Sequence, residues 1–268
     1  MTDVVRPPCA ELLKVAQAID QMIAQYRMAL RSVAAIGEWE APQEGFTLGW
    51  LLIRNVEAVI LMARHNEVLV TAAWSNTRTA FELSARIIWM LQPDDRYEAE
   101  CRWLAFLGEW ESTEQKLVQE VPEHADLHTT RAQAIRDFRE GVICGLPSGY
   151  GPPRMPRFRD ILTALDNPQL YRFYREGSRY IHGSMYVGTS YSKNLGTMRK
   201  LGDFTSAVDW ILPLRLCWLS LREATKFILE RLTVPQGAMP DWSEVDERTD
   251  AAFQELASYA VELRQHGR

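Results

Sequence analysis

The sequence predicts an all-α protein, a multi-helix bundle with long antiparallel helices. Apolar residues recur at helical spacing through nearly all of the 268 residues. No two alternating segments are joined by a hairpin signal, and there is no internal repeat or low-complexity tract. We expect one helical domain over 1–268, with an N-terminal helix and connector (1–42), a core bundle (43–232) and a C-terminal helix (233–268).

Proline, glycine and capping residues predict where the helices begin and end. Gly37 ends the first helix, the Gln92-Pro93 step ends the third, and Pro213 predicts a kink in the long apolar helix near the C-terminus. Asp241 or Ser243 can cap the last helix. The expected helices are 9–36, 46–64, 67–91, 95–121, 122–141, a short one ending near 165, one carrying 171–186, 204–232, and one after 241.

Three segments are predicted as connections. "EWEAPQEG" (38–45) joins the first two helices, and "GTSYSKNLGTMRKLG" (188–202) is a polar loop. "CGLPSGYGPPRMPRF" (144–158) holds four prolines and three glycines in fifteen residues, so it cannot sustain a helix or an interior strand. We expect the core to come from the second, third and long apolar helices and from the helix carrying 171–186.

The composition favours a cytoplasmic protein without a membrane span. The apolar stretches "WLLIRNVEAVILMA" and "WILPLRLCWLSL" are interrupted by charged residues and fall short of the roughly 20 apolar residues of a membrane span. The N-terminus lacks the apolar centre of a signal peptide, and the four cysteines are far apart, which suits a reducing compartment.

The net charge of −5 conceals a basic tract. Between 149 and 201, nine Lys and Arg residues face three acidic ones, so this tract is near +6 and the remainder near −11. Six of the nine tyrosines lie in or beside it. Such a tract can bind phosphates and stack bases, or it can be a set of surface arginines paired with acidic neighbours from elsewhere in the fold.

Two helices carry ion pairs in apolar surroundings. Arg78 and Glu82 are four residues apart, and Arg54 and Glu57 are three apart, spacings that put each pair on one helix face. Structural ion pairs that hold the bundle together are one interpretation. A polar pocket between the two helices, with Glu57 and Glu82 as its carboxylates, is the other.

His124 and His128 share the i,i+4 spacing that can chelate a metal from one helix face. The sequence supplies no Glu-x-x-His pair around them, so we expect two histidines on a solvated helix and no metal. Phosphate-cradling and dinucleotide-binding glycine motifs and a nucleophile elbow are absent, and no cofactor is predicted.

The densest chemistry lies in "LYRFYREGSRYIHGSMYV" (170–187). At 100° per residue, one stripe of this helix carries its polar and aromatic side chains, and the opposite side carries Tyr174, Gly177, Ile181 and small or apolar residues for packing. The stripe consists of Tyr171, Arg175, Ser178, Arg179, His182 and Tyr186.

These side chains suit phosphate chemistry without a metal. An imidazole exchanges protons near neutral pH, and a guanidinium holds a phosphate and stabilises charge that develops on it. Together they can promote attack of a ribose 2′-hydroxyl on the neighbouring phosphate. The alternative is that His182 and Tyr171 bond across helices while the arginines meet acids.

The chain resembles the HEPN superfamily (higher eukaryotes and prokaryotes nucleotide-binding), whose motif is Arg, four to six residues, then His on a late helix. Arg175, six residues and His182 match the motif, with Glu176 where Asn or Asp is common. "RTAFE" and "YRFYREGSRYIHGS" also look like a bacterial helical family of unknown function, over about 45–230.

The resemblance implies a metal-independent endoribonuclease acting at a dimer interface, in a toxin or phage-defence context. His182 would be the general acid/base and Arg175 the phosphate clamp, with Arg179, Ser178, Tyr171 and Tyr186 binding substrate. The implied partners are RNA, a second copy of the chain, and an antitoxin or other protein. The alternative function is a non-catalytic helical binding or interaction protein.

Overall fold

A computed structural model gives the fold and describes residues 5–33, 36–182, 192–195, 198–201, 205–232 and 239–265. Its α-helices are, in chain order, α1 (Ala10–Arg31), α2 (Glu40–His65), α3 (Val70–Leu91), α4 (Arg96–Glu120), α5 (Ala125–Gly145), α6 (Phe158–Ala164), α7 (Tyr171–Ile181), α8 (Ile211–Arg231) and α9 (Trp242–Gln265). Short 3-10 turns are η1 (Glu67–Leu69), η2 (Pro122–His124), η3 (Pro168–Leu170) and η5 (Ala207–Trp210). The all-α fold class is confirmed.

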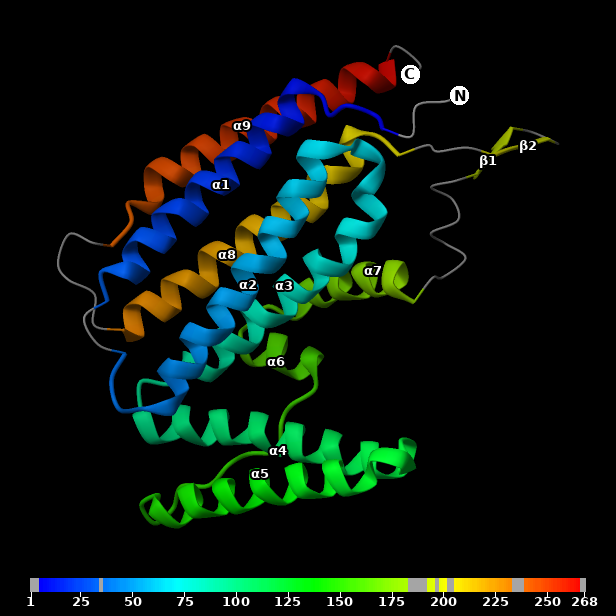
Figure 1. Ribbon diagram of the computed structural model, residues 1–268. Helices are drawn as coiled ribbons and strands as arrows, with labels where there is room; N and C mark the ends of the chain where they lie inside the picture. The colour runs from blue at the N-terminus through cyan, green and yellow to red at the C-terminus, as the bar shows by residue number, and fades with distance from the viewer. Residues whose placement is uncertain are drawn as a thin grey trace.

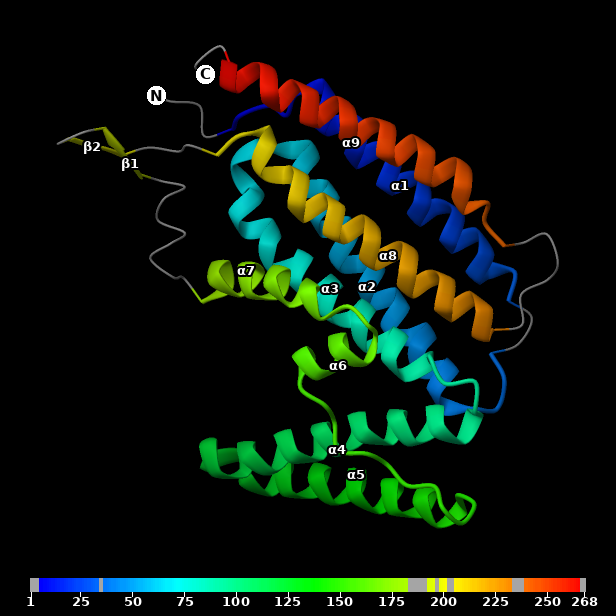
Figure 2. The same ribbon diagram turned by 180° about the vertical axis from the view of Figure 1, so that it is seen from behind.

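The helices form three tiers (Figure 1). The central tier is α2, α3 and α8, which pack against one another; α1 and α9 lie side by side above it. The hairpin of α4 and α5 lies below, and the same arrangement is seen from behind in Figure 2. The short helices α6 and α7 lie against the flank of α3.

One large apolar core joins α1, α2, α3, α8, α9 and the start of α4. A second, smaller cluster lies where α6 and α7 meet α3, around Trp74, Phe81, Phe158 and Leu162. The expectation that the helix carrying 171–186 belongs to the main core was therefore wrong, because that helix packs on the second cluster while α1 contributes to the main one.

Most predicted helix boundaries fall within a few residues of the observed ones, with two informative differences. The segment 40–45 belongs to α2 and not to a connector, because Pro42 lies in the first turn, where no intrahelical N–H bond is lost. The buried carboxylate of Glu100, from α4, accepts the N–H of Ala41 at 2.8 Å and so caps this helix start. Burial raises the pKa of Glu100.

Pro213 is likewise the third residue of α8, so the expected kink inside a helix starting near 204 was wrong. The preceding turn η5 is closed by Ser206, whose N–H donates to Asp209 Oδ2 at 2.8 Å. The polar loop predicted over 188–202 includes a two-stranded antiparallel hairpin, β1 (Ser192–Leu195) and β2 (Met198–Leu201), which the sequence pattern did not reveal.

By length and composition alone, α2 is apolar enough to cross a membrane. Core helices of soluble proteins meet the same criterion, and α2 packs here against α1, α3 and α8. The cytoplasmic location and the absence of a membrane span stay predictions.

Close packing between α2 and its neighbours depends on Gly49. A Cβ atom at this position would lie 2.8 Å from Ile228 Cδ1 and 2.9 Å from Tyr26 Oη, both in the buried core. The Tyr26 hydroxyl is buried and has no hydrogen-bond partner within the described residues. Any side chain at residue 49 must therefore displace both of these groups.

We expect Gly49→Ala to lower the free energy of unfolding by about 1–3 kcal/mol, because overpacking outweighs the gain in helix propensity. Tyr26→Phe removes the unpaired hydroxyl, so it should leave stability unchanged or raise it, and it should reduce the loss caused by Gly49→Ala. Urea unfolding of the two single variants and the double variant measures this coupling.

Gly141→Ala in α5 is the matched control, since a Cβ there meets nothing within 4 Å. It should raise stability by about 0.4–1 kcal/mol. Equal effects at residues 49 and 141 would contradict the proposed steric restriction.

Candidate functional site

Helix α7 is held against α3 by a contact that only glycine permits. A Cβ atom at Gly177 would lie 2.9 Å from Arg78 Cβ and 3.5 Å from the Trp74 ring. Gly177 is the buried residue of this helix, as its predicted packing role requires. The absence of a side chain lets the two helix backbones approach each other closely.

Aromatic side chains on both sides of Gly177 fix the rotation of α7. Tyr180 stacks on Trp74 with ring centroids 5.1 Å apart and planes 8° apart. The ring centroids of Tyr174 and Phe158 are 4.4 Å apart. The ring and the hydroxyl of Tyr174 both contact the guanidinium of Arg78, which lies 4.3 Å from the centroid of the Tyr174 ring. These contacts determine which face of α7 points away from the protein.

The outward face of α7 carries three arginines and a histidine. At 100° per residue, Arg172, Arg175, Arg179 and His182 fall within an arc of about 80°, opposite Gly177. All four are exposed. We call this set the α7 basic face. Arg172 was not among the residues singled out from the sequence, although the same helical spacing contains it.

The members of the α7 basic face differ in how they are held. Arg179 binds Glu176 at 2.9 Å, and the guanidinium of Arg172 lies over the ring of Phe173, 4.5 Å from its centroid. Arg175 and His182 have exposed side chains with no hydrogen bond or ion pair to any other described residue. His182 is the C-cap of the helix, and its backbone N–H donates to the carbonyl of Ser178.

The other expected stripe residues are placed differently. The Ser178 hydroxyl donates to the Tyr174 carbonyl at 2.8 Å, within the helix. Tyr171 is half-buried and stacks on Tyr174, with centroids 5.6 Å apart. Ile181, expected on the packing side, is 38% exposed. Helix α7 ends at Ile181, and Tyr186 lies outside the described residues.

The basic tract is mostly unpaired where the structure describes it. The arginines of the tract between residues 149 and 182 are all exposed, and of these only Arg179 forms an ion pair. The others are Arg154, Arg157, Arg159, Arg172 and Arg175. By contrast, ion pairs to acidic side chains hold many arginines elsewhere in the chain, namely Arg27, Arg54, Arg64, Arg78, Arg86, Arg102, Arg136, Arg139, Arg222, Arg231 and Arg248. Of the two interpretations of this tract, the unpaired arginines favour contact with an external anion.

Both predicted ion pairs are present, and the Arg54 side chain of one of them is exposed. Arg54 binds Glu57 at 2.8 Å, and Arg27 from α1 reaches the same carboxylate at 2.5 Å. Glu82 lies 3.7 Å from Arg78 and 3.1 Å from Arg86.

The two carboxylates therefore belong to separate ion-pair networks. This arrangement is that of structural pairs linking helices, and it does not bring Glu57 and Glu82 together as the carboxylates of one pocket.

His128 is not on a solvated face as expected. Its Nδ1 lies 2.7 Å from Oε2 of Glu114, which is 6% exposed between α4 and α5, and Trp110 Nε1 donates to the same carboxylate at 3.2 Å. His124 is exposed at the start of α5. Within the described ranges, no group of three or more His, Cys, Asp or Glu side chains is arranged to hold a metal.

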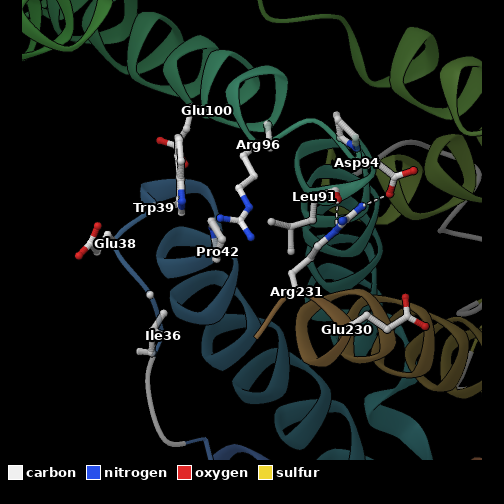
Figure 3. A pocket seen from close by; sticks show the side chains of 13 residues that line it. Ile36, Glu38, Trp39, Pro42, Leu91, Asp94, Arg96, Glu100, Glu230 and Arg231 are labelled. Atoms are coloured by element: carbon white, nitrogen blue, oxygen red, sulfur yellow. Dashed lines mark hydrogen bonds and ion pairs between the residues drawn. The ribbon is translucent and has the colours of Figure 1, made fainter. Parts of the chain in front are cut away.

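A hollow of about 530 Å³ lies where the starts of α2 and α4 meet the ends of α3 and α8 (Figure 3). Arg231 crosses it to bind the carbonyl of Leu91 at 2.9 Å and Asp94 at 3.1 Å, while Arg96 extends from α4 towards Pro42. Arg231 thus serves to fasten α8 to the C-terminus of α3.

Comparison with known proteins yields no matching family model, no matching curated protein and no matching solved structure. The class of protein is therefore described from its fold and its site alone. The chain is an all-α bundle that presents a basic face on a short helix packed against its flank.

The pair of Glu114 and His128 predicts a pH dependence of stability. The hydrogen bond from His128, followed by that from Trp110, lowers the pKa of Glu114 from its ordinary value. The Glu114 carboxylate therefore binds a proton more readily in the unfolded chain than in the folded one. Its contribution to the free energy of unfolding is complete above the unfolded pKa, about 4.3, and is lost as the pH falls below that value.

We expect Glu114→Gln to lower stability at pH 7 and to flatten the decline between pH 5 and 3, measured as the urea midpoint at each pH. Glu120→Gln changes an exposed carboxylate on the same helix and should leave both unchanged. A decline of the same steepness in Glu114→Gln and in the unmodified protein would contradict the assignment.

Proposed function

We propose that this protein cleaves RNA without a metal, as a HEPN-type endoribonuclease with Arg175 and His182 as its catalytic pair. One observation supports the proposal most directly: both side chains are exposed on the outward face of α7, and neither has a partner among the described residues. An ordered structural role would require such partners, since buried or paired polar groups are what fix a histidine or arginine in a fold.

The chemistry follows from these two groups. His182 takes the proton of a ribose 2′-hydroxyl, whose oxygen forms a bond to the adjacent phosphorus while the bond from phosphorus to the 5′-oxygen breaks. Arg175 holds the non-bridging oxygens and stabilises the charge that develops on them. The departing 5′-oxygen receives a proton from the imidazolium that His182 has become, which leaves a 2′,3′-cyclic phosphate and a 5′-hydroxyl and returns His182 to its neutral form.

The helical spacing accommodates a substrate between the two groups. Seven residues of helix rise about 10.5 Å, and seven steps of 100° bring His182 back to within about 20° of Arg175 around the axis. A ribose and its phosphate fit between side chains that approach from the two ends of this interval. Arg172 extends the basic face by a further turn, where it can meet a neighbouring phosphate.

The ion pair with Glu176 distinguishes Arg179 from Arg172 and Arg175. The Glu176 carboxylate binds Arg179, so this guanidinium carries less net positive charge towards a ligand than Arg172 or Arg175 does. We therefore assign phosphate binding to Arg175 and Arg172 and give Arg179 a supporting role. The uncovered face also suits a symmetric homodimer in which two α7 helices face each other, and an antitoxin or other protein partner could cover the same face.

We expect purified protein to cleave single-stranded RNA in the presence of EDTA. His182→Ala should lower the cleavage rate by about 10²–10⁴-fold, because it removes the group that transfers protons. Arg172→Gln should mainly weaken RNA binding and reduce its dependence on salt concentration. Gel analysis of labelled RNA and filter binding at several salt concentrations provide the measurements.

His124→Ala and Arg31→Gln are matched controls, since both residues are exposed and lie on other helices. They should retain cleavage and binding. RNA that stays intact but binds through Arg172 and Arg175 would support the alternative, a non-catalytic binding module. Absence of both cleavage and binding would refute the proposal.

A further inference from the structure

A second cavity lies on the inner side of α7, away from the basic face. It is a groove of about 440 Å³ between α3, α8 and the segment that runs from α6 through η3 to the start of α7. Most of its surface is carbon, from side chains that include Phe81, Leu162, Phe173, Leu216 and Phe227. Its size and lining are those of sites that take small organic molecules.

One residue that lines this groove carries a buried hydroxyl without a partner among the described residues. Ser220 on α8 lines the groove and is 3% exposed, and its Oγ makes no hydrogen bond to any described residue. Hydroxyls in helices commonly bond to the carbonyl four residues earlier, as Thr249 and Ser258 do in α9. A buried hydroxyl without a partner is unfavourable, so a ligand group that met it would recover the lost hydrogen-bond free energy.

The charges around the groove restrict the ligand further. Among the described residues, no lysine or arginine lines it, so an anion would find no counter-charge from that part of the chain. The one acidic residue among its described lining residues, Glu223, is paired with Arg222. Ser84 on α3 is a second buried hydroxyl residue along the wall, and Asn167 is exposed.

We propose that this groove binds an uncharged, mostly apolar small molecule that carries one hydrogen-bonding group, and that this group meets the Ser220 hydroxyl. Because a hydroxyl both donates and accepts, a single N–H, hydroxyl or carbonyl on the ligand satisfies it. The proposal rests on the inner wall of α7 and on α8, and it holds whether or not the basic face cleaves RNA.

The probe for this proposal is N-phenyl-1-naphthylamine, a neutral, apolar molecule with one N–H group whose fluorescence rises in apolar surroundings. Titration into the full chain should give saturable binding of one molecule per chain. Ser220→Ala should weaken binding about fivefold, the loss of one hydrogen bond. Ala85→Leu places a larger side chain in the groove wall and should abolish saturable binding.

Ser220→Ala removes an unpaired buried hydroxyl, so its thermal midpoint should not fall, and this variant stays informative if Ala85→Leu does not fold. Ser258→Ala, on α9 and away from the groove, is the matched control and should bind like the unmodified protein. No saturable binding, or equal binding by the unmodified protein, Ser220→Ala and a folded Ala85→Leu, would overturn the proposal.

Discussion

The contact between Gly177 and the side chain of Arg78 determines what this protein presents to its surroundings. With no Cβ on α7 at this point, the helix lies directly on α3, and the flanking rings of Tyr174 and Tyr180 fix its rotation. Since helix geometry places every other side chain relative to these, the direction of Arg175 and His182 follows from the packing on the opposite side. Packing and candidate chemistry therefore occupy one short helix without competing for the same residues.

The arginines of α7 and the rest of the basic tract differ from many other arginines of the protein in how often a carboxylate pairs with them. In the body of the protein, arginines such as Arg86, which binds both Glu82 and Glu109, connect helices through carboxylates. Of the six arginines of the basic tract between residues 149 and 182, five lack such a carboxylate. An exposed guanidinium without a carboxylate keeps its full capacity for an external anion. The proposed RNA site depends on this difference more than on the number of positive residues.

Sequence periodicity predicted the fold class and most helix ends, because apolar spacing and local caps such as Asp95, which accepts the N–H of Tyr97, are encoded within a few residues. Sequence periodicity failed where a residue distant in the sequence determines the local structure. The start of α2 is capped by Glu100 from another helix, and the pairing of His128 depends on Glu114 fourteen residues away. The hairpin of β1 and β2 has no alternating pattern that would have revealed it.

The same limit applies to the candidate site. Helical spacing placed Arg175, Arg179 and His182 on one face and Gly177 on the other, because a single angle per residue suffices for this. It could not tell that the Ser178 hydroxyl would bond within its own helix, or that Tyr171 would stack on Tyr174, since both depend on rotamers and on neighbours from elsewhere. Nor could it reveal the groove behind α7, whose walls come from segments more than a hundred residues apart.

The hairpin of α4 and α5 has a consequence for how the protein opens. Polar contacts help to join its two helices, including Arg136 to Glu111 at 2.8 Å, and the fully buried residues of α5 are Ala132 and Ile135. Helix α5 therefore has fewer fully buried residues than the central helix α8, so less burial opposes its separation from α4. Its amides should exchange with solvent through local opening, as a cooperative unit distinct from the central helices, so this arm can loosen while the rest of the bundle stays folded.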